Sequence, residues 1–281
     1  MKDLIKAIRS SANMNQELFA SALGTTPLSI NRWENGKTIP NRMAQTQLYS
    51  FCKERAIDVT ELIINTKTYD NNSDKLVLYH GSKKGIVGGI APISRDECDF
   101  GSGFYMGTNT LQPLTLICNE DKPKFYTVEL DMTGLNVLNI EIGMDWAMLI
   151  AYYRKEMESA RGTDIYEKYA HMADGYDIII GYIANDRMYT ELSRFFNKTL
   201  TDVALINCLS ALDLGKQYVA ISEKACKQIE ILKEEPLSSL ELSLLKDMSA
   251  QRRKEGIALA EEIEVKYRRE GKFFDEILKG E

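Results

Sequence analysis

The sequence is poor in the residues that build metal centres and disulfide frameworks. It has two histidines, and its five cysteines are scattered without any pair spaced as Cys-x-x-Cys. A zinc site needs Cys and His ligands at short, regular spacings, so this pattern argues against a metal. The odd number of cysteines favours reduced, buried thiols over disulfides. We therefore expect no metal cofactor.

Long apolar runs are also absent. None approaches the roughly 20 residues that cross a bilayer. The first ten residues read as the start of an amphipathic helix and lack the apolar core of a secretion signal. We therefore expect a cytoplasmic protein without a membrane partner. Its 281 residues, 44% hydrophobic and 27% charged, are enough for about two globular domains.

Charge is distributed unevenly along the chain. Residues 1–66 carry eight Lys/Arg and six Asp/Glu, a net +2, and the whole chain is −6, which leaves −8 for the remainder. A mildly basic end on an acidic body is compatible with DNA binding at that end alone. We predict a helical domain over 1–66, a polar linker over 67–75, an α+β domain over 76–235 and a helical extension over 236–281.

The first domain contains a helix-turn-helix pattern. Residues 15–23 predict a short helix. After a glycine turn, Thr26 is a suitable N-cap for a second helix, and Pro27 is tolerated at its first position because the missing N–H would have no partner there. Ile30 and Trp33 are then expected to face the core of the domain.

This segment, NQELFASALGTTPLSINRWENGKTIP, resembles the helix-turn-helix of phage repressors and Cro-type regulators. The resemblance implies that Gln16 caps the first helix against a DNA phosphate and that the Asn35 backbone contacts another. It places Pro27, Leu28 and Arg32 against base edges. Relatives often carry glutamines at the first two of these positions, so Arg32 is the side chain left to contact guanine.

Two further expectations concern the partners of this domain. Such domains usually act as homodimers, because a single module buries too little surface for tight, specific DNA binding. A helical domain that binds protein, or that only dimerises, is the alternative interpretation, since a fold does not determine a function.

The second domain has the pattern of alternating strands and helices. Short apolar runs bounded by glycine and aspartate predict strands over 76–79, 125–130, 177–180 and 217–221. Helical segments are predicted over 143–160 and 201–213, and one or two helices over 238–279.

Two short motifs in this domain indicate a functional site when they are considered together. Leu78-Tyr79-His80-Gly81-Ser82 ends an apolar strand, and DFGSGFY, from Asp99 to Tyr105, follows some 20 residues later. Glycines two residues apart in the second motif, the later being Gly103, permit a backbone path close to a ligand. Each motif alone fits an ordinary strand end, and the pair is what indicates a site.

The two motifs together resemble the signature of poly(ADP-ribose) polymerases and diphtheria-type ADP-ribosyltransferases. More closely, residues 76–233, with GYDIIIGYIANDRMY and LGKQYVAIS, resemble a bacterial group of ADP-ribosyltransferase-like domains found beside toxin–antitoxin-type partners. The resemblance implies a split, mixed or antiparallel sheet and NAD as co-substrate. The expected fold class is therefore multidomain: an all-α helix-turn-helix domain, an α+β ADP-ribosyltransferase-like domain and a helical C-terminal tail.

The resemblance also implies roles for single residues. His80 would hold ribose hydroxyls of NAD, the Gly81 backbone would fix the carboxamide, and Ser82 and Gly103 would support the pocket. Tyr105 would stack on the nicotinamide ring. These roles suit the chemistry, because cleavage of the glycosidic bond develops positive charge on the ribose, and the protein must orient the ring and supply electron density.

The third catalytic position departs from the family pattern. Gln217 stands where relatives usually carry glutamate, and an amide offers a developing cation much less field than a carboxylate. Chain elongation is therefore not expected, which leaves single transfer, hydrolysis of NAD or binding without catalysis. Asp186, paired with Arg187 after an apolar strand, is a candidate source of the missing charge, with an ion-paired surface turn as the alternative.

Three functional interpretations follow. The first is an NAD-dependent mono-ADP-ribosyltransferase, a toxin or defence effector that autoregulates through its DNA-binding domain and has an antitoxin or regulatory protein as a candidate partner. The second is a non-catalytic transcription regulator that senses NAD or ADP-ribose, and Gln217 favours it. The third is a structural interaction protein. The enzyme interpretation places His80, Tyr105 and Gln217 together on one cleft.

Overall fold

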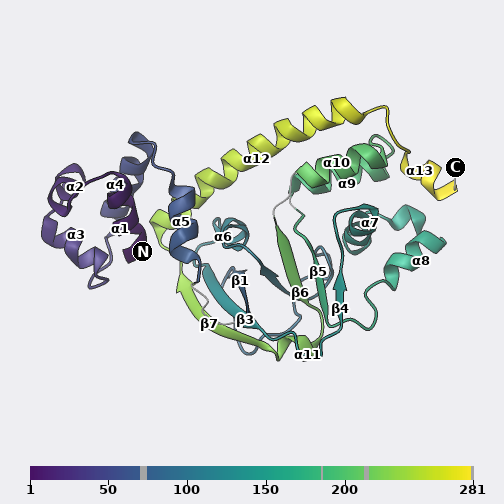
Figure 1. Cartoon of the computed structure of the whole chain (residues 1–281), viewed down its shortest axis with the longest axis horizontal. Coiled ribbons are helices and arrows are strands. Elements are labelled where there is room, and N and C mark those ends of the chain that lie inside the picture. Colours follow the sequence, from purple (N-terminus) through teal and green to yellow (C-terminus); the bar gives the residue numbers. More distant parts are fainter. Residues whose placement is uncertain (70–74, 185, 212–214, 280–281) are drawn as a thin grey trace.

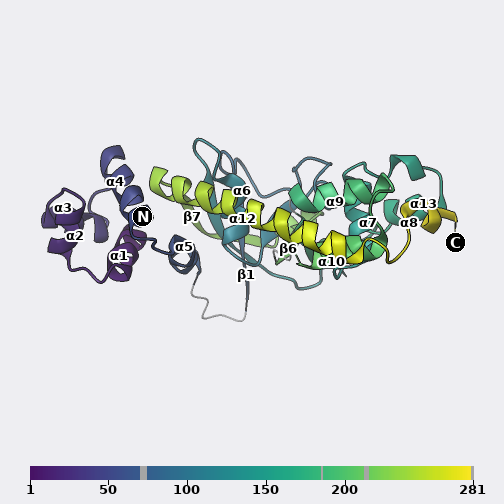
Figure 2. The same ribbon diagram turned by 90° about the horizontal axis from the view of Figure 1, so that it is seen from above.

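The computed structural model describes residues 1–69, 75–184, 186–211 and 215–279. It contains a helical N-terminal domain, a seven-stranded sheet flanked by helices, and a long helix, α12 (Ser239–Tyr267), that runs beside both (Figure 1). Seen from above, α12 lies lengthwise along the molecule (Figure 2). Within the described ranges, no helix is both long and apolar enough to span a bilayer.

The N-terminal domain is built from short capped helices. They are α1 (Lys2–Ser11), α2 (Gln16–Ala22), α3 (Pro27–Glu34), α4 (Arg42–Glu54) and α5 (Val59–Lys67). The side chains of Asn15 and Thr26 accept backbone N–H groups at the starts of α2 and α3, and Pro27 opens α3 as predicted. Ile30 and Trp33 are buried. The predicted helix-turn-helix is therefore confirmed.

The sheet is mixed, as expected, but its seven strands form one sheet and not the split sheet that was also expected. Its strands are β1 (Leu76–Ser82), β2 (Phe104–Gly107), β3 (Lys124–Leu130), β4 (Val137–Asn139), β5 (Ile178–Tyr182), β6 (Lys216–Ala220) and β7 (Ile229–Pro236), in the order β4-β5-β6-β2-β1-β3-β7. β4 and β5 pair in parallel, and the other neighbouring strands pair antiparallel. The strands predicted from apolar runs are confirmed as β1, β3, β5 and β6.

Helices cover the sheet and its ends. They are α6 (Leu111–Ile117), α7 (Met144–Tyr153), a 3-10 turn (Glu158–Ala160), α8 (Asp164–Ala170), α9 (Asp186–Phe196), α10 (Asp202–Ala211), α11 (Glu223–Cys226), α12 and α13 (Phe274–Lys279). The helical segment predicted over 143–160 is confirmed in part, since α7 covers Met144–Tyr153 and the 3-10 turn follows. The segment is interrupted because Lys155 has a φ of 62°, which a right-handed helix does not accommodate.

The hydrophobic core is divided by the sheet. On one face of the sheet, Leu78, Phe104, Tyr126, Val128 and Ala220, which belong to β1, β2, β3 and β6, pack together in one buried cluster. The opposite face of β5 and β6 packs against α7, α9 and α10, with Trp146 and Phe195 fully buried. Alternate residues of each strand therefore enter different packing layers.

The N-terminal domain shares a core with the sheet and α12. The predicted stripe of Leu240, Leu244, Leu245 and Met248 on α12 is buried. It belongs to one cluster with Leu4 and Leu48 of the N-terminal domain, Tyr79 of β1, and Leu114 of α6. The two domains are thus packed together through α12.

A buried ionic cluster lies at the same junction. The Lys67 ammonium is 3.0 Å from a Glu241 oxygen and 3.3 Å from a Glu235 oxygen. Lys67 is 4% exposed and Glu241 1%. The assignment of Lys67 to a polar linker is therefore wrong, since it is the last residue of α5 and is held by β7 and α12. A single-sequence pattern could not show this, because both carboxylates are more than 160 residues away.

Candidate functional site

The two strands that carry the predicted motifs meet at the centre of the sheet. β1 is joined to β2 at Tyr79 and Gly107. β1 pairs along its whole length with β3, and β2 with β6. His80 directly follows Tyr79 in β1 and therefore lies next to this pair.

The His80 imidazole connects the two strands. Its Nδ1 lies 2.7 Å from the carbonyl oxygen of Tyr105, and its ring stacks on Phe104 with centroids 4.3 Å apart. A carbonyl oxygen can only accept, so Nδ1 carries the proton and Nε2 is left as an acceptor. Burial lowers the pKa of His80, although the Tyr105 carbonyl opposes this, so the ring is neutral at pH 7.

The expected convergence of the three side chains on a single cleft is wrong. Residues paired across antiparallel strands point to the same face, so the register Tyr79–Gly107–Gln217 places these three on one side. Tyr105 faces that side too, whereas His80 alternates to the other, beside Phe104. The strands are adjacent as expected, but the sheet separates the imidazole from the phenol and the amide.

The Tyr105 phenol is held by the loop that precedes its strand. Its hydroxyl donates to the Gly101 carbonyl at 2.7 Å and accepts the Phe100 N–H at 3.0 Å. Burial, and then the nearby Asp99 carboxylate, raise the pKa of Tyr105, so the phenol stays protonated. The ring is therefore held in a fixed orientation on the face of the sheet that also carries Gln217.

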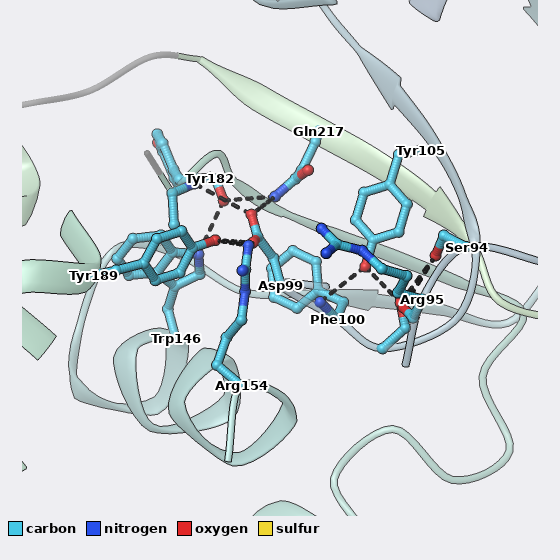
Figure 3. A network of polar contacts seen from close by, with 12 residues as sticks. Ser94, Arg95, Asp99, Phe100, Tyr105, Trp146, Arg154, Tyr182, Tyr189 and Gln217 are labelled. Atoms are coloured by element: carbon cyan, nitrogen blue, oxygen red, sulfur yellow. Dashed lines mark hydrogen bonds and ion pairs between the residues drawn. The ribbon is translucent and has the colours of Figure 1, made fainter. Parts of the chain in front are cut away.

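Gln217 belongs to a buried polar network on that face (Figure 3). It is 3% exposed. Its Nε2 donates to Asp99 Oδ2 at 2.9 Å and to the Tyr182 carbonyl at 3.1 Å. The same carbonyl accepts the Trp146 indole N–H at 3.1 Å. The predicted catalytic amide is thus fixed in place by its neighbours.

Asp99 is the centre of this network and was not singled out as a site residue from the sequence. Its Oδ1 lies 2.8 Å from an Arg154 guanidinium nitrogen and accepts the Tyr189 hydroxyl, and its Oδ2 also accepts the Ala184 N–H at 3.3 Å. Asp99 opens the DFGSGFY motif, which was the available signal. Its partners are the residue that caps the C-terminal end of α7, a residue that follows β5, and residues of α9 and β6, and no sequence spacing relates them.

The predicted pocket glycines make room for protein atoms. A Cβ at Gly81 would stand 2.6 Å from the Pro113 carbonyl oxygen, and one at Gly103 would stand 2.5 Å from Val219 Cγ1. These glycines therefore allow α6 to approach β1 and the 94–103 loop to approach β6. Ser82 is partly exposed at the end of β1.

A cavity of about 550 Å³ is lined in part by the loop that holds Tyr105. Its lining includes Gly101, Ser102, Tyr152, Tyr153, Arg161 and Tyr166. None of the predicted site residues that the structure describes is among the lining residues. Asp186 begins α9, and its side chain lies outside the described part of the chain.

Among the described residues, no three His, Cys, Asp or Glu side chains are grouped so that they could hold a metal ion. The titratable groups near the predicted site are instead engaged in hydrogen bonds and ion pairs with protein atoms.

The predicted DNA-contacting residues occupy one surface of the N-terminal domain. Pro27, Leu28, Arg32 and Asn35 are exposed, and Leu28 is 60% exposed although it is apolar. Such an exposed leucine could contact a thymine methyl group in the major groove.

The prediction that Gln16 caps α2 is wrong. The cap is Asn15, whose side chain accepts the Leu18 N–H at 2.8 Å. Gln16 donates to Glu34 at 2.7 Å, and Glu34 also binds Arg9 at 2.6 Å. Gln16 therefore ties α2 to α3, and its phosphate contact stays a prediction.

Comparisons with known proteins assign both parts of the chain. Residues 5–42 match a family model described as helix-turn-helix, which supports a regulatory DNA-binding role for the N-terminal domain. No curated protein and no solved structure matches the chain. Residues 76–231 match the family described as protein of unknown function, DUF3990. Because this match covers more than half of the chain, the protein belongs to the DUF3990 family.

Proposed function

We propose that the protein is an NAD-dependent mono-ADP-ribosyltransferase, acting as a toxin or defence effector, whose helix-turn-helix domain binds the DNA that controls its own expression. The observation that carries this proposal is the placement of Gly81, Tyr105 and Gln217. These three come from separate motifs, lie on the adjacent strands β1, β2 and β6, and face the same side of the sheet.

The residues on this face are suited in kind to a nicotinamide nucleotide. Tyr105 offers a fixed aromatic ring for stacking, and Gln217 offers an amide oxygen that can accept from a ribose hydroxyl. His80 acts from the other face as a positioning residue, because its hydrogen bond to the Tyr105 carbonyl holds β2 against β1. These groups orient the substrate, which is a large part of such catalysis.

The reaction is a substitution at the anomeric carbon of the nicotinamide ribose. The C–N bond to nicotinamide breaks, and its electron pair leaves with the ring. An acceptor oxygen or nitrogen forms the new bond to that carbon and releases a proton. With an amide at position 217, we expect a single transfer or hydrolysis, and no chain growth.

We expect the wild-type protein to release nicotinamide from labelled NAD and His80→Ala to do so about 100-fold more slowly, since a small displacement of the reacting groups has an effect of this size. His171→Ala is the matched control, because His171 is exposed at the end of α8. Label on protein, DNA or RNA identifies the acceptor. Equal rates for wild type and His80→Ala, or no release by either, would remove the enzyme proposal.

A second candidate function is a transcription regulator that senses NAD or ADP-ribose without turnover. Two observations favour it: Gln217 is bound by Asp99, and the DNA-binding domain shares a core with β1. Under this proposal, either nucleotide changes DNA affinity by roughly 5-fold to 150-fold, the usual range of coupling between sites. Fluorescence anisotropy on a DNA duplex selected with the wild-type protein measures this. An unchanged affinity at saturating nucleotide would exclude the regulator.

A further inference from the structure

We infer that Asp99 is a positioning residue that sets the orientation and the electron density of the Gln217 amide. The inference rests on the proposed function, because it concerns the position where the glutamate of related enzymes is replaced. Asp99 is 6% exposed and Gln217 is 3% exposed, so both groups act in a largely water-excluded environment.

The first step concerns the orientation of the amide. Nε2 of Gln217 faces two groups that only accept hydrogen bonds, the Asp99 carboxylate and the Tyr182 carbonyl. A rotated amide would direct its oxygen at both of them and set acceptor against acceptor, which is costly between buried groups. Oε1 is therefore on the opposite side of the amide, toward Tyr105 in the view of Figure 3.

The second step concerns the state of Asp99. Arg154 and the Tyr189 hydroxyl donate to one of its oxygens, and Gln217 and the Ala184 N–H donate to the other. All four partners are donors, so the network is satisfied by the ionised carboxylate and not by the acid. Burial, followed by Asp99 itself, raises the pKa of Tyr189, which keeps this phenol a donor.

The third step concerns electron density. A carboxylate that accepts from an amide N–H polarises the amide and increases the negative partial charge on its oxygen, an effect that is larger in a low-dielectric interior. Asp99 and Gln217 together therefore present a fixed, electron-rich acceptor on the Tyr105 face. This acceptor can hold a ribose hydroxyl and face the charge that develops during cleavage.

Asp99→Asn tests the inference most directly, because it keeps the size of the side chain and removes the charge. We expect kcat for nicotinamide release to fall about 10-fold to 100-fold with KM little changed, as for loss of a charged hydrogen bond used mainly in the transition state. Asp96→Asn is the matched control, since Asp96 lies in the same loop with an 80% exposed side chain.

An exchange of the two groups provides the second variant. Gln217→Glu alone places a second carboxylate beside Asp99, and one of the two must then take up a proton, so we expect lower stability and activity at pH 7. The double variant Asp99→Asn/Gln217→Glu restores one donor and one carboxylate. We expect it to recover part of the melting temperature and of kcat lost in Gln217→Glu, since the Tyr182 carbonyl and the Ala184 N–H then lack matching partners, and it also gives an answer if Asp99→Asn alone unfolds.

The outcomes separate this inference from the proposed function. If wild type and Asp96→Asn release nicotinamide and Asp99→Asn does so with unchanged kcat and KM, the role of Asp99 is rejected and the enzyme proposal stands. Recovery of the melting temperature without recovery of kcat in the double variant also rejects that role, because it marks a purely structural pair. If the wild type releases none, the enzyme proposal itself fails, and the inference with it.

Discussion

Lys67→Met is expected to lower the free energy of unfolding by about 3–5 kcal/mol, the usual effect of removing one partner of a buried ion pair. The variant leaves the Glu241 carboxylate, which is 1% exposed, without the ammonium that lies 3.0 Å from it. Glu235 loses the same partner. Urea unfolding of the full chain measures the change.

The pH dependence of this effect has a definite sign. Burial opposes ionisation of Glu241, but the Lys67 ammonium, the N-terminal ammonium of Met1 and hydrogen bonds from Ser238 together outweigh it and lower the pKa of this carboxyl. A lowered pKa stabilises the fold above the unfolded value of about 4.3 and loses that contribution as the pH falls through the folded value. The difference between wild type and Lys67→Met is therefore largest at neutral pH and narrows in acid.

Lys53→Met is the matched control for this prediction. Lys53 pairs with Asp247 at 2.9 Å across the same junction, but both side chains are substantially exposed. Exposed pairs contribute at most about 1 kcal/mol, so the control should unfold almost as the wild type does. If the two variants lost similar stability, the buried cluster would not be what fixes α5 to α12.

Arg32→Ala is expected to weaken binding to a selected DNA duplex about 10-fold to 100-fold, because a side chain that reads guanine contributes about 1–3 kcal/mol of discrimination. Arg32 is exposed on α3, on the surface that also presents Leu28. The measurement is anisotropy at a fixed salt concentration, since affinity for DNA depends strongly on salt. The loss should be accompanied by relaxed preference at one base pair.

Arg55→Ala removes the same charge from another part of the domain. Arg55 caps the C-terminal end of α4, and its guanidinium packs 4.7 Å from the centre of the Phe51 ring. This control should keep the affinity and base preference of the wild type. Equal losses from both variants would mean that net charge, and not contact by α3, determines the binding.

Local structure could be predicted well where local chemistry decides it. Thr26 and Pro27 mark the start of α3 because a hydroxyl cap and a fixed φ act within one turn. The strand β1 and the leucine stripe of α12 were predictable because burial of one layer or one stripe leaves a periodic pattern. The proximity of the motif strands was also expected from their resemblance to known domains.

The side of the sheet on which each predicted residue acts could not be predicted in this way. A shift of one residue in register moves a side chain to the opposite face, and no motif states the register of β1 against β2. The structure places His80 against Phe104 and Tyr105 against the 94–103 loop. Asp99 was missed for a related reason, since its value comes from Arg154 and Gln217, 55 and 118 residues away.

The sequence by itself determined the helix-turn-helix, the strand and helix content, and the residue types available for chemistry, because caps, turns and hydrophobic periods act over a few neighbouring residues. Tertiary structure alone decided that His80 and Tyr105 lie on opposite faces, that Asp99 holds Gln217, and that Lys67 and Glu241 join the two domains. These depend on register and on the packing of distant segments, and their energies arise only when burial removes water from the paired groups.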